Sequence, residues 1–276
     1  MGWTGDAGSE RESAVRFGEG VAFRVAGPRR CLGVWRGGRR SVCPGWAAVP
    51  VRGTRAQCAE CAGIDRAQSV AADTIADDPR PYHVYLAWFG DGLVKVGITG
   101  VGRGSARLLE QGAVAYTWLG QGPLMAARRA EELLRVALGV PDRIPYGTKR
   151  IVRAGAESGR ARAELGRAHG IAVGLDGWPE SLARLPCAVV GHEEAFGLAA
   201  VDRVDAVVGG VGEGAVVAGR VVAAAGPDLH LVEAGGRRLV VDTRVLAGWP
   251  LAAAGDGAAG TGIEVREVPA VQGGLF

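Results

Sequence analysis

Residues 82–113 read YHVYLAWFGDGLVKVGITGVGRGSARLLEQGA. The first eight of these residues are aromatic and apolar, residues 90–92 (GDG) are typical of a hairpin turn, and residues 93–98 supply a returning strand. The segment that follows, up to Arg107, leads into a short helix. The pattern therefore predicts a β-hairpin followed by a helix that carries arginine.

The next segment extends this hairpin into a small antiparallel sheet with helices. Residues 114–119 (VAYTWL) predict a third strand, and Pro123 introduces a helix over 124–138. Glu131 lies on the apolar stripe of that helix. A carboxylate in that position needs a partner, which is either a divalent metal or a salt bridge to Arg128 or Arg135.

We expect an α+β protein of three parts. Residues 1–66 form a cysteine-rich zinc-binding arm, residues 67–170 form the small antiparallel sheet with its helices, and residues 171–276 form a small all-β domain. In the last part, valine-rich runs are broken by glycine-containing turns at 226–227 and 235–236. These runs predict a strand meander within a small barrel or sandwich.

Charge and hydropathy limit the classes of function. Residues 1–66 and 67–170 carry net charges of +5 and +4, whereas residues 171–276 carry −6. The basic parts favour a nucleic-acid partner, although an ordinary solvated surface fits the same counts, and the acidic part favours a protein partner or intramolecular docking. No run of eighteen apolar residues and no apolar signal core occur, so we expect a cytoplasmic protein without a membrane contact.

Four cysteines, Cys31, Cys43, Cys58 and Cys61, lie close together, the last two as Cys-x-x-Cys. Four thiolates suit structural zinc, while disulfides, a redox pair or unrelated buried cysteines are the alternatives. Residues 11–66 contain few large aliphatic side chains, so we expect zinc to supply much of their folding free energy. Cys187 stands apart and is predicted to be a small core residue.

Two positions in the hairpin carry a family resemblance. Tyr85 lies in His-Val-Tyr on the first strand, and Gly97 lies in Lys-Val-Gly on the second. In this order they resemble the two motifs of the GIY-YIG nuclease superfamily. His83 stands where that family has a glycine, and Lys95 stands where it has the second tyrosine, which is similar to its lysine-bearing branches.

The resemblance implies the remaining members of the site. The family's arginine corresponds to Arg107 or to Arg103, of which Arg107 has the register of the helix after the hairpin. The metal-binding glutamate of the family corresponds to Glu131, which would carry Mg²⁺ or Mn²⁺. Most of residues 31–150 is also similar to a bacterial family of unknown function in which a cysteine cluster precedes a related sequence.

Phosphodiester hydrolysis needs an activated water, a cation at the phosphate and a metal at the leaving oxygen. Tyr85, His83 or Lys95 would accept the proton of that water, and Arg107 would hold the phosphate. The leading interpretation is therefore metal-dependent cleavage of DNA or RNA. The alternatives are a non-catalytic nucleic-acid-binding or regulatory protein on the same scaffold, and an enzyme that uses the pocket for a small molecule.

Downstream of the hairpin, two basic segments are further candidates for contact with nucleic acid. Residues 142–150 read as a basic loop that ends in Lys149 and Arg150, and residues 156–169 read as an arginine-rich helix. Both segments could lie along a phosphate backbone. An ordinary solvated helix explains the second segment equally well, because its arginines alternate with glutamates.

Overall fold

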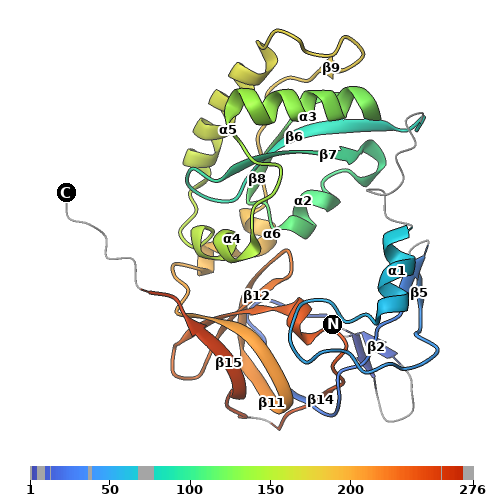
Figure 1. Ribbon diagram of the computed structural model, residues 1–276. Coiled ribbons are helices and arrows are strands. Elements are labelled where there is room, and N and C mark those ends of the chain that lie inside the picture. Colours follow the sequence, from blue (N-terminus) through green and yellow to red (C-terminus); the bar gives the residue numbers. More distant parts are fainter. Residues whose placement is uncertain are drawn as a thin grey trace. The chain divides into compact units, whose positions relative to one another are not determined.

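The computed structural model describes residues 2–4, 10–12, 14–36, 39–67, 78–255 and 257–269. The chain forms two compact units, which are described one at a time (Figure 1). Unit 1 comprises Met1–Thr74, Val204–Ala223 and Asp228–Phe276, and unit 2 comprises Ile75–Arg203 and Ala224–Pro227. The described residues form six α-helices and several sheets, which confirms the predicted α+β class.

Unit 2 is built on an antiparallel sheet in the order β10-β8-β6-β7, with β9 pairing β8. Its strands are β6 (Pro81–Trp88), β7 (Val94–Gly100), β8 (Ala115–Pro123), β9 (Ala183–Arg184) and β10 (Val190–Gly191). Its helices are α2 (Ala106–Gln111), α3 (Leu124–Leu138), α4 (Tyr146–Val152), α5 (Ser158–Val173) and α6 (Glu193–Phe196), with 3₁₀ turns η1 (Val101–Arg103) and η2 (Leu198–Ala200). The predicted hairpin, third strand and long helix are therefore confirmed.

Both faces of this sheet are covered by helices, α3 and α5 on one side and α2 and α4 on the other (Figure 1). Trp88 points toward α5, where its indole N–H donates to Glu164 at 2.9 Å. Phe89 points the other way and lies beneath Lys149 of α4. Burial of both faces explains why the first strand reads as a continuous aromatic and apolar run rather than as an alternating one.

Two predictions about unit 2 were wrong. Residues 146–150 of the predicted basic loop belong to helix α4 (Tyr146–Val152), which follows Pro145, a residue whose fixed φ suits the start of a helix. Lys149 and Arg150 are only 3% and 7% exposed, because the helix turns them into the unit. Cys187 is exposed, in a segment without regular structure between β9 and β10, so it is not a core residue.

Unit 1 contains a sheet in the order β12-β13-β11-β3-β14, with β15 pairing β11, and two separate hairpins. Its N-terminal elements are β1 (Gly2–Thr4), β2 (Glu10–Glu12), β3 (Gly20–Val25), β4 (Val34–Arg36), β5 (Arg39–Ser41) and α1 (Ala59–Ala67). Its C-terminal elements are β11 (Ala206–Ala225), β12 (Asp228–Val232), β13 (Arg238–Asp242), η3 (Thr243–Leu246), β14 (Leu251–Ala253) and β15 (Thr261–Glu267). The predicted meander corresponds to β11, β12 and β13.

Strand β3 belongs to the N-terminal part of the chain but pairs with strands of the C-terminal part. These two parts are separate domains in the three-part division predicted from the sequence. Strand β3 pairs with β11 on one side and with β14 on the other, both antiparallel. Phe23 and Val25 lie on either side of the exposed Arg24 in β3 and are 0% and 1% exposed. A strand with one apolar face must pack that face against a core, and here the core is formed by the valine-rich strands of the C-terminal part.

A buried arginine attaches the cysteine-rich segment to this sheet. Arg29 is 2% exposed, and its guanidinium donates to the carbonyl oxygens of Ala247 at 2.8 Å, Pro50 at 2.8 Å and Gly53 at 3.0 Å. Beside it, the backbone of Gly248 comes so close that an added Cβ would lie 2.4 Å from the Arg30 carbonyl oxygen. The cysteine-rich segment therefore packs directly on the C-terminal part of unit 1.

In the part of the chain that the structure describes, every helix is too short or too polar to cross a membrane.

Candidate functional site

The four N-terminal cysteines come together in unit 1. We call Cys31, Cys43, Cys58 and Cys61 the cysteine cluster; their sulfur atoms all lie within 4.8 Å of one another. Tetrahedral zinc with Zn–S bonds of about 2.3 Å separates its sulfurs by roughly 3.8 Å, so this spacing fits. All four thiols are free, and together they could bind a metal such as zinc.

Local structure positions these thiols and lowers the pKa of Cys43, whereas burial raises the pKa of Cys61. Cys31 precedes β4, Cys43 follows β5, and the other two lie at the start of α1. The backbone N–H of Cys58 donates to the sulfur of Cys31 at 3.2 Å, as that of Gly33 does at 3.4 Å. A hydrogen bond from the Ala47 backbone is the main reason that the pKa of Cys43 falls to about 7. Such N–H to sulfur bonds stabilise thiolates, which are the form that binds metal.

A second group of candidate residues comes together in unit 2. We call Tyr85, Lys95, Arg107 and Glu131 the tyrosine–lysine site; they come from β6, β7, α2 and α3 respectively. The charges of Arg107 and Glu131 act on both Tyr85 and Lys95. Four residues that were selected from the sequence thus lie close enough for the charges of Arg107 and Glu131 to reach Tyr85 and Lys95.

Tyr85 is the buried centre of this site. Its side chain is 1% exposed, and its hydroxyl accepts a hydrogen bond from the Gln111 amide at 3.0 Å. It lies opposite Gly97 in the strand register, where an added Cβ would be 2.4 Å from the Tyr85 oxygen. Glycine is therefore required at position 97 by the close approach of the ring. Burial is the main reason that the pKa of Tyr85 is raised, so the phenol stays protonated at neutral pH.

Lys95 is a buried amine whose proton is weakly held. The side chain is 8% exposed, and its ammonium donates to the backbone oxygen of Asp142 at 2.9 Å. Burial lowers the pKa of Lys95 to about 8, with a further contribution from the positive charge of Arg107. Lys95 is thus an amine that can lose and regain a proton near neutral pH.

Glu131 is a half-buried carboxylate on α3, next to the fully buried Ala130. Burial raises the pKa of Glu131, the nearby Lys95 lowers it, and the like charge of Asp142 raises it again. Within the described residues, its carboxylate forms no hydrogen bond and no ion pair. The predicted alternative, a salt bridge to Arg128 or Arg135, is not formed, and Arg135 instead pairs with Glu132.

The two candidate arginines differ in their neighbours. Arg103 donates to Glu110 at 2.6 Å, whereas Arg107 lies 3.9 Å from the other oxygen of that carboxylate. Both side chains are about half exposed, and Arg107 is the one whose charge reaches Tyr85 and Lys95. Arg107 therefore combines contact with solvent and influence on the buried groups.

His83 belongs to a row of aromatic rings beside the site. Its ring stacks on Trp118 with a centroid distance of 4.4 Å, and Trp118 also meets the edges of Tyr85 and Tyr116. Burial lowers the pKa of His83, which the Gly120 backbone partly opposes. The imidazole is consequently neutral near pH 7 and is held by stacking.

The two basic residues predicted to contact nucleic acid lie away from the surface. The ammonium of Lys149 is 4.0 Å from the ring centroid of Phe89 and 4.7 Å from that of Tyr146. Arg150 is also buried. These positions suit packing and cation–π contact within the unit better than contact with a phosphate.

Sequence reasoning missed two residues that contact the tyrosine–lysine site. Gln111 fixes the Tyr85 hydroxyl, and Asp142 holds Lys95 through its carbonyl oxygen while its charge acts on Glu131. Gln111 lies within the stretch that decides the fold, four residues after Arg107. Its position on the same helical face as that arginine is the signal that could have identified it.

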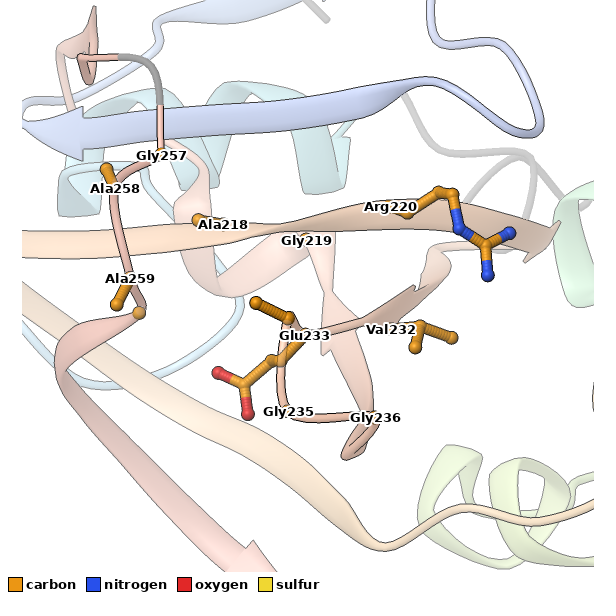
Figure 2. Close-up of a pocket in the computed structure, with 12 residues that line it drawn as sticks. Ala218, Gly219, Arg220, Val232, Glu233, Gly235, Gly236, Gly257, Ala258 and Ala259 are labelled. Carbon is orange, nitrogen blue, oxygen red and sulfur yellow. The ribbon is translucent and has the colours of Figure 1, made fainter.

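Unit 1 also has a groove of about 700 Å³ beside β11 and β12 (Figure 2). Glycine and alanine form most of its lining, and Arg220 and Glu233 are the charged residues in that lining. In Figure 2 these two side chains point in different directions. The groove thus offers backbone groups and small side chains and does not bring its charged groups together.

Comparison with known proteins assigns a family. Residues 18–251 match the family described as "Protein of unknown function (DUF2797)". The chain belongs to this family. The matched DUF2797 segment contains both the cysteine cluster and the tyrosine–lysine site. None of the curated proteins and none of the solved structures matches the chain.

Proposed function

We propose that the tyrosine–lysine site catalyses metal-dependent cleavage of phosphodiester bonds in nucleic acid. The observation that carries this proposal is the convergence of a titratable amine, an exposed arginine and an unpaired carboxylate around Tyr85. These groups supply the base, the phosphate contact and the metal ligand that the reaction requires. The resemblance of the hairpin to GIY-YIG nucleases supports the same reaction.

Lys95 is the best candidate for the general base. A base must be partly unprotonated at the working pH, and the pKa of Lys95 is about 8, whereas that of Tyr85 is raised. The neutral amine would accept the proton of the attacking water. Tyr85, held by Gln111, would orient the amine or the water through its hydroxyl. The lysine thus takes the role that the missing second tyrosine has in related sites.

Arg107 and Glu131 would act on the phosphate group. The half-exposed guanidinium of Arg107 can hold a phosphate oxygen and stabilise the negative charge that develops during attack. Glu131 would hold Mg²⁺ or Mn²⁺, and its half-buried, unpaired carboxylate fits such an ion. When bound, the ion supplies positive charge to the leaving oxygen; magnesium sites commonly use one or two carboxylates together with phosphate oxygens.

The cysteine cluster is proposed to bind structural zinc rather than to take part in catalysis. Its four ligands fill a tetrahedral shell, which leaves no position open for water or substrate. Zinc there would stabilise unit 1 and the surface that it presents.

A cleavage assay with a matched pair of variants tests the proposal. Glu131→Gln should lose roughly 100-fold or more of the metal-dependent cleavage rate on single-stranded, duplex or branched DNA or RNA. Glu132→Gln is the control, because Glu132 is the adjacent, exposed residue that pairs with Arg135. Equal rates for the two variants would contradict the proposed site.

The second candidate function is non-catalytic nucleic-acid binding. The burial of Tyr85 favours non-catalytic binding. The residue is only 1% exposed, so its hydroxyl has little access to the water that hydrolysis requires. Salt-dependent binding without turnover, in wild type and both variants, would identify this function. A rate that rises with pH up to about 8 in wild type and is lost in Lys95→Arg would instead support the base.

A further inference from the structure

The cysteine-rich part of unit 1 exposes two large aromatic side chains. We call residues 29–67 the cysteine module. Trp35 and Trp46 are 63% and 58% exposed, while the other tryptophans with described side chains are buried or half-buried. Burying a tryptophan side chain is energetically favourable. Two tryptophans that remain exposed on one small module therefore indicate a binding surface that a partner covers in a complex.

Each of these tryptophans has an arginine beside it. Trp35 and Arg40 are directly opposite in the β4–β5 register, so they share one face of the hairpin. Arg30 donates to the carbonyl oxygen of Trp46 at 3.2 Å. The module as a whole carries a net charge of +6. Exposed aromatic side chains with arginines on neighbouring positions suit a ligand that is both planar and anionic.

The backbone at Trp46 gives an independent indication that its side chain is used. Its φ is +44°, and among the described residues it is the single non-glycine residue with positive φ. Trp46 is the last residue of the turn that begins at Cys43, and its N–H donates to the Cys43 carbonyl oxygen at 3.2 Å. Glycine adopts left-handed φ at little cost, and a residue with a side chain does not. Backbone geometry alone would favour glycine at this position.

We propose that the cysteine module binds single-stranded nucleic acid, with bases stacked on Trp35 and Trp46 and phosphates held by the arginines around them. Stacking requires unpaired bases, because in a duplex the base faces are covered by their neighbours. Every base has a π-face, so binding tolerates many sequences. The net charge of the module adds a phosphate contribution that weakens as salt is raised.

The site lies in unit 1 and does not depend on the proposed cleavage reaction. Its test is a binding measurement on the full, zinc-loaded chain without added Mg²⁺ or Mn²⁺, so that failure of the cleavage proposal leaves it unaffected. The probes are fluorescent oligo(dT) and oligo(U), with a hairpin duplex of the same length for comparison. Fluorescence anisotropy gives the affinity, and quenching of tryptophan emission reports stacking directly.

Single variants should separate stacking from general charge. Trp35→Ala and Trp46→Ala should each weaken single-strand binding roughly 10-fold. Val136→Ala, which removes an exposed apolar side chain in unit 2, should leave binding unchanged. Arg30→Ala, which removes the guanidinium next to Trp46, should lower the affinity and reduce the salt slope by about one. The affinity for duplex should be lower than that for single strands, and the tryptophan variants should bind duplex as tightly as wild type does.

Replacing Trp46 by glycine distinguishes a binding role from a structural one. Because φ is +44° there, Trp46→Gly should unfold at a higher temperature than Trp46→Ala, yet both should lose the same affinity. The proposal is overturned if the tryptophan variants bind single strands like wild type. It is also overturned if they lose a protein partner while nucleic-acid binding is unchanged.

Discussion

Unit 2 buries its large aromatic residues, whereas the cysteine module of unit 1 exposes them. Trp88, Phe89 and Tyr85 are at most 1% exposed beneath the helices of unit 2. In the module, the buried cluster consists of cysteines with small aliphatic residues such as Val34, Val49 and Ala56. Burial of a large aromatic side chain stabilises a fold by a few kcal/mol, so unit 2 can be stable on packing alone and the module cannot.

The module replaces apolar packing with directed bonds. Arg29 reaches several backbone carbonyl groups, and the cysteine cluster offers four metal ligands. Hydrogen bonds and metal–ligand bonds of this kind can hold a small module rigid while its outer surface stays exposed to solvent. This difference suggests why the proposed stacking surface is found on the module and the proposed catalytic groups are found within the packed unit.

Metal removal tests the comparison with the largest expected effect. Structural zinc in small domains contributes on the order of 10 kcal/mol to folding. Chelation should therefore increase hydrogen exchange throughout residues 31–61 and at the contact of Arg29 with Ala247, while the amides of β6 and β8 in unit 2 remain protected. Hydrogen exchange with mass spectrometry makes this measurement on the intact chain.

The cysteines provide a matched control for this experiment. Cys58→Ser should reproduce the effect of chelation, whereas Cys187→Ser, at an exposed site outside the cluster, should behave like wild type. Loss of protection in unit 2 as well, or no change in residues 31–61, would mean that the two parts are stabilised in the same way.

A buried charge tests whether unit 2 is stabilised by packing. In the unfolded chain Lys95 titrates near 10.5, and in the folded protein its pKa is about 8. Below pH 8 the ammonium is charged in both states and the folded state is destabilised by about 3 kcal/mol. Lys95→Met should therefore increase the stability of unit 2 at pH 7 by about 2 kcal/mol, because the lost bond to Asp142 offsets part of the gain.

The stability difference between Lys95→Met and wild type should depend on pH. Between pH 8 and 10.5 the unfolded chain binds more protons at this residue than the folded protein does, so wild-type stability rises with pH. The advantage of Lys95→Met should shrink over that range. Urea unfolding of both proteins, followed through the exchange of β6 and β7 amides, measures the difference. A variant that is less stable than wild type at pH 7 would show that the Asp142 bond outweighs the burial of the charge.

Local patterns predicted the elements of unit 2 well. Pro123 before the helix and Gly139 after it, where φ is +62°, set the bounds of α3 that the sequence predicted. The hairpin was equally clear from its glycine turn. The cysteine cluster was predicted from the short distance in sequence between its four cysteines. That prediction required only that the local fold bring the four thiols together.

Contacts between distant segments were beyond reach of the same patterns. The pairing of β3 with β11 joins residues about 200 positions apart, and nothing in a six-residue strand specifies its partner. The burial of Lys149 was missed because its charge suggested a loop, whereas its contact with Phe89 depends on how α4 packs. The roles of Gln111 and Asp142 likewise depend on tertiary packing.

Close packing at Tyr85 gives the most local of these effects. An alanine at position 97 would place its Cβ 2.4 Å from the Tyr85 oxygen and 2.5 Å from its Cζ, so the ring must move. Gly97→Ala should therefore cost unit 2 about 2 kcal/mol, a typical cost of overpacking, as measured by urea unfolding. Gly100→Ala on the same strand is the control, because its Cβ would lie 4.0 Å from Tyr82, at ordinary contact distance. Equal costs would mean that alanine in β7 is unfavourable for another reason. If the ring is the cause, Tyr85→Leu combined with Gly97→Ala should cost less than the two single changes added together, because the smaller side chain leaves room for the new methyl group.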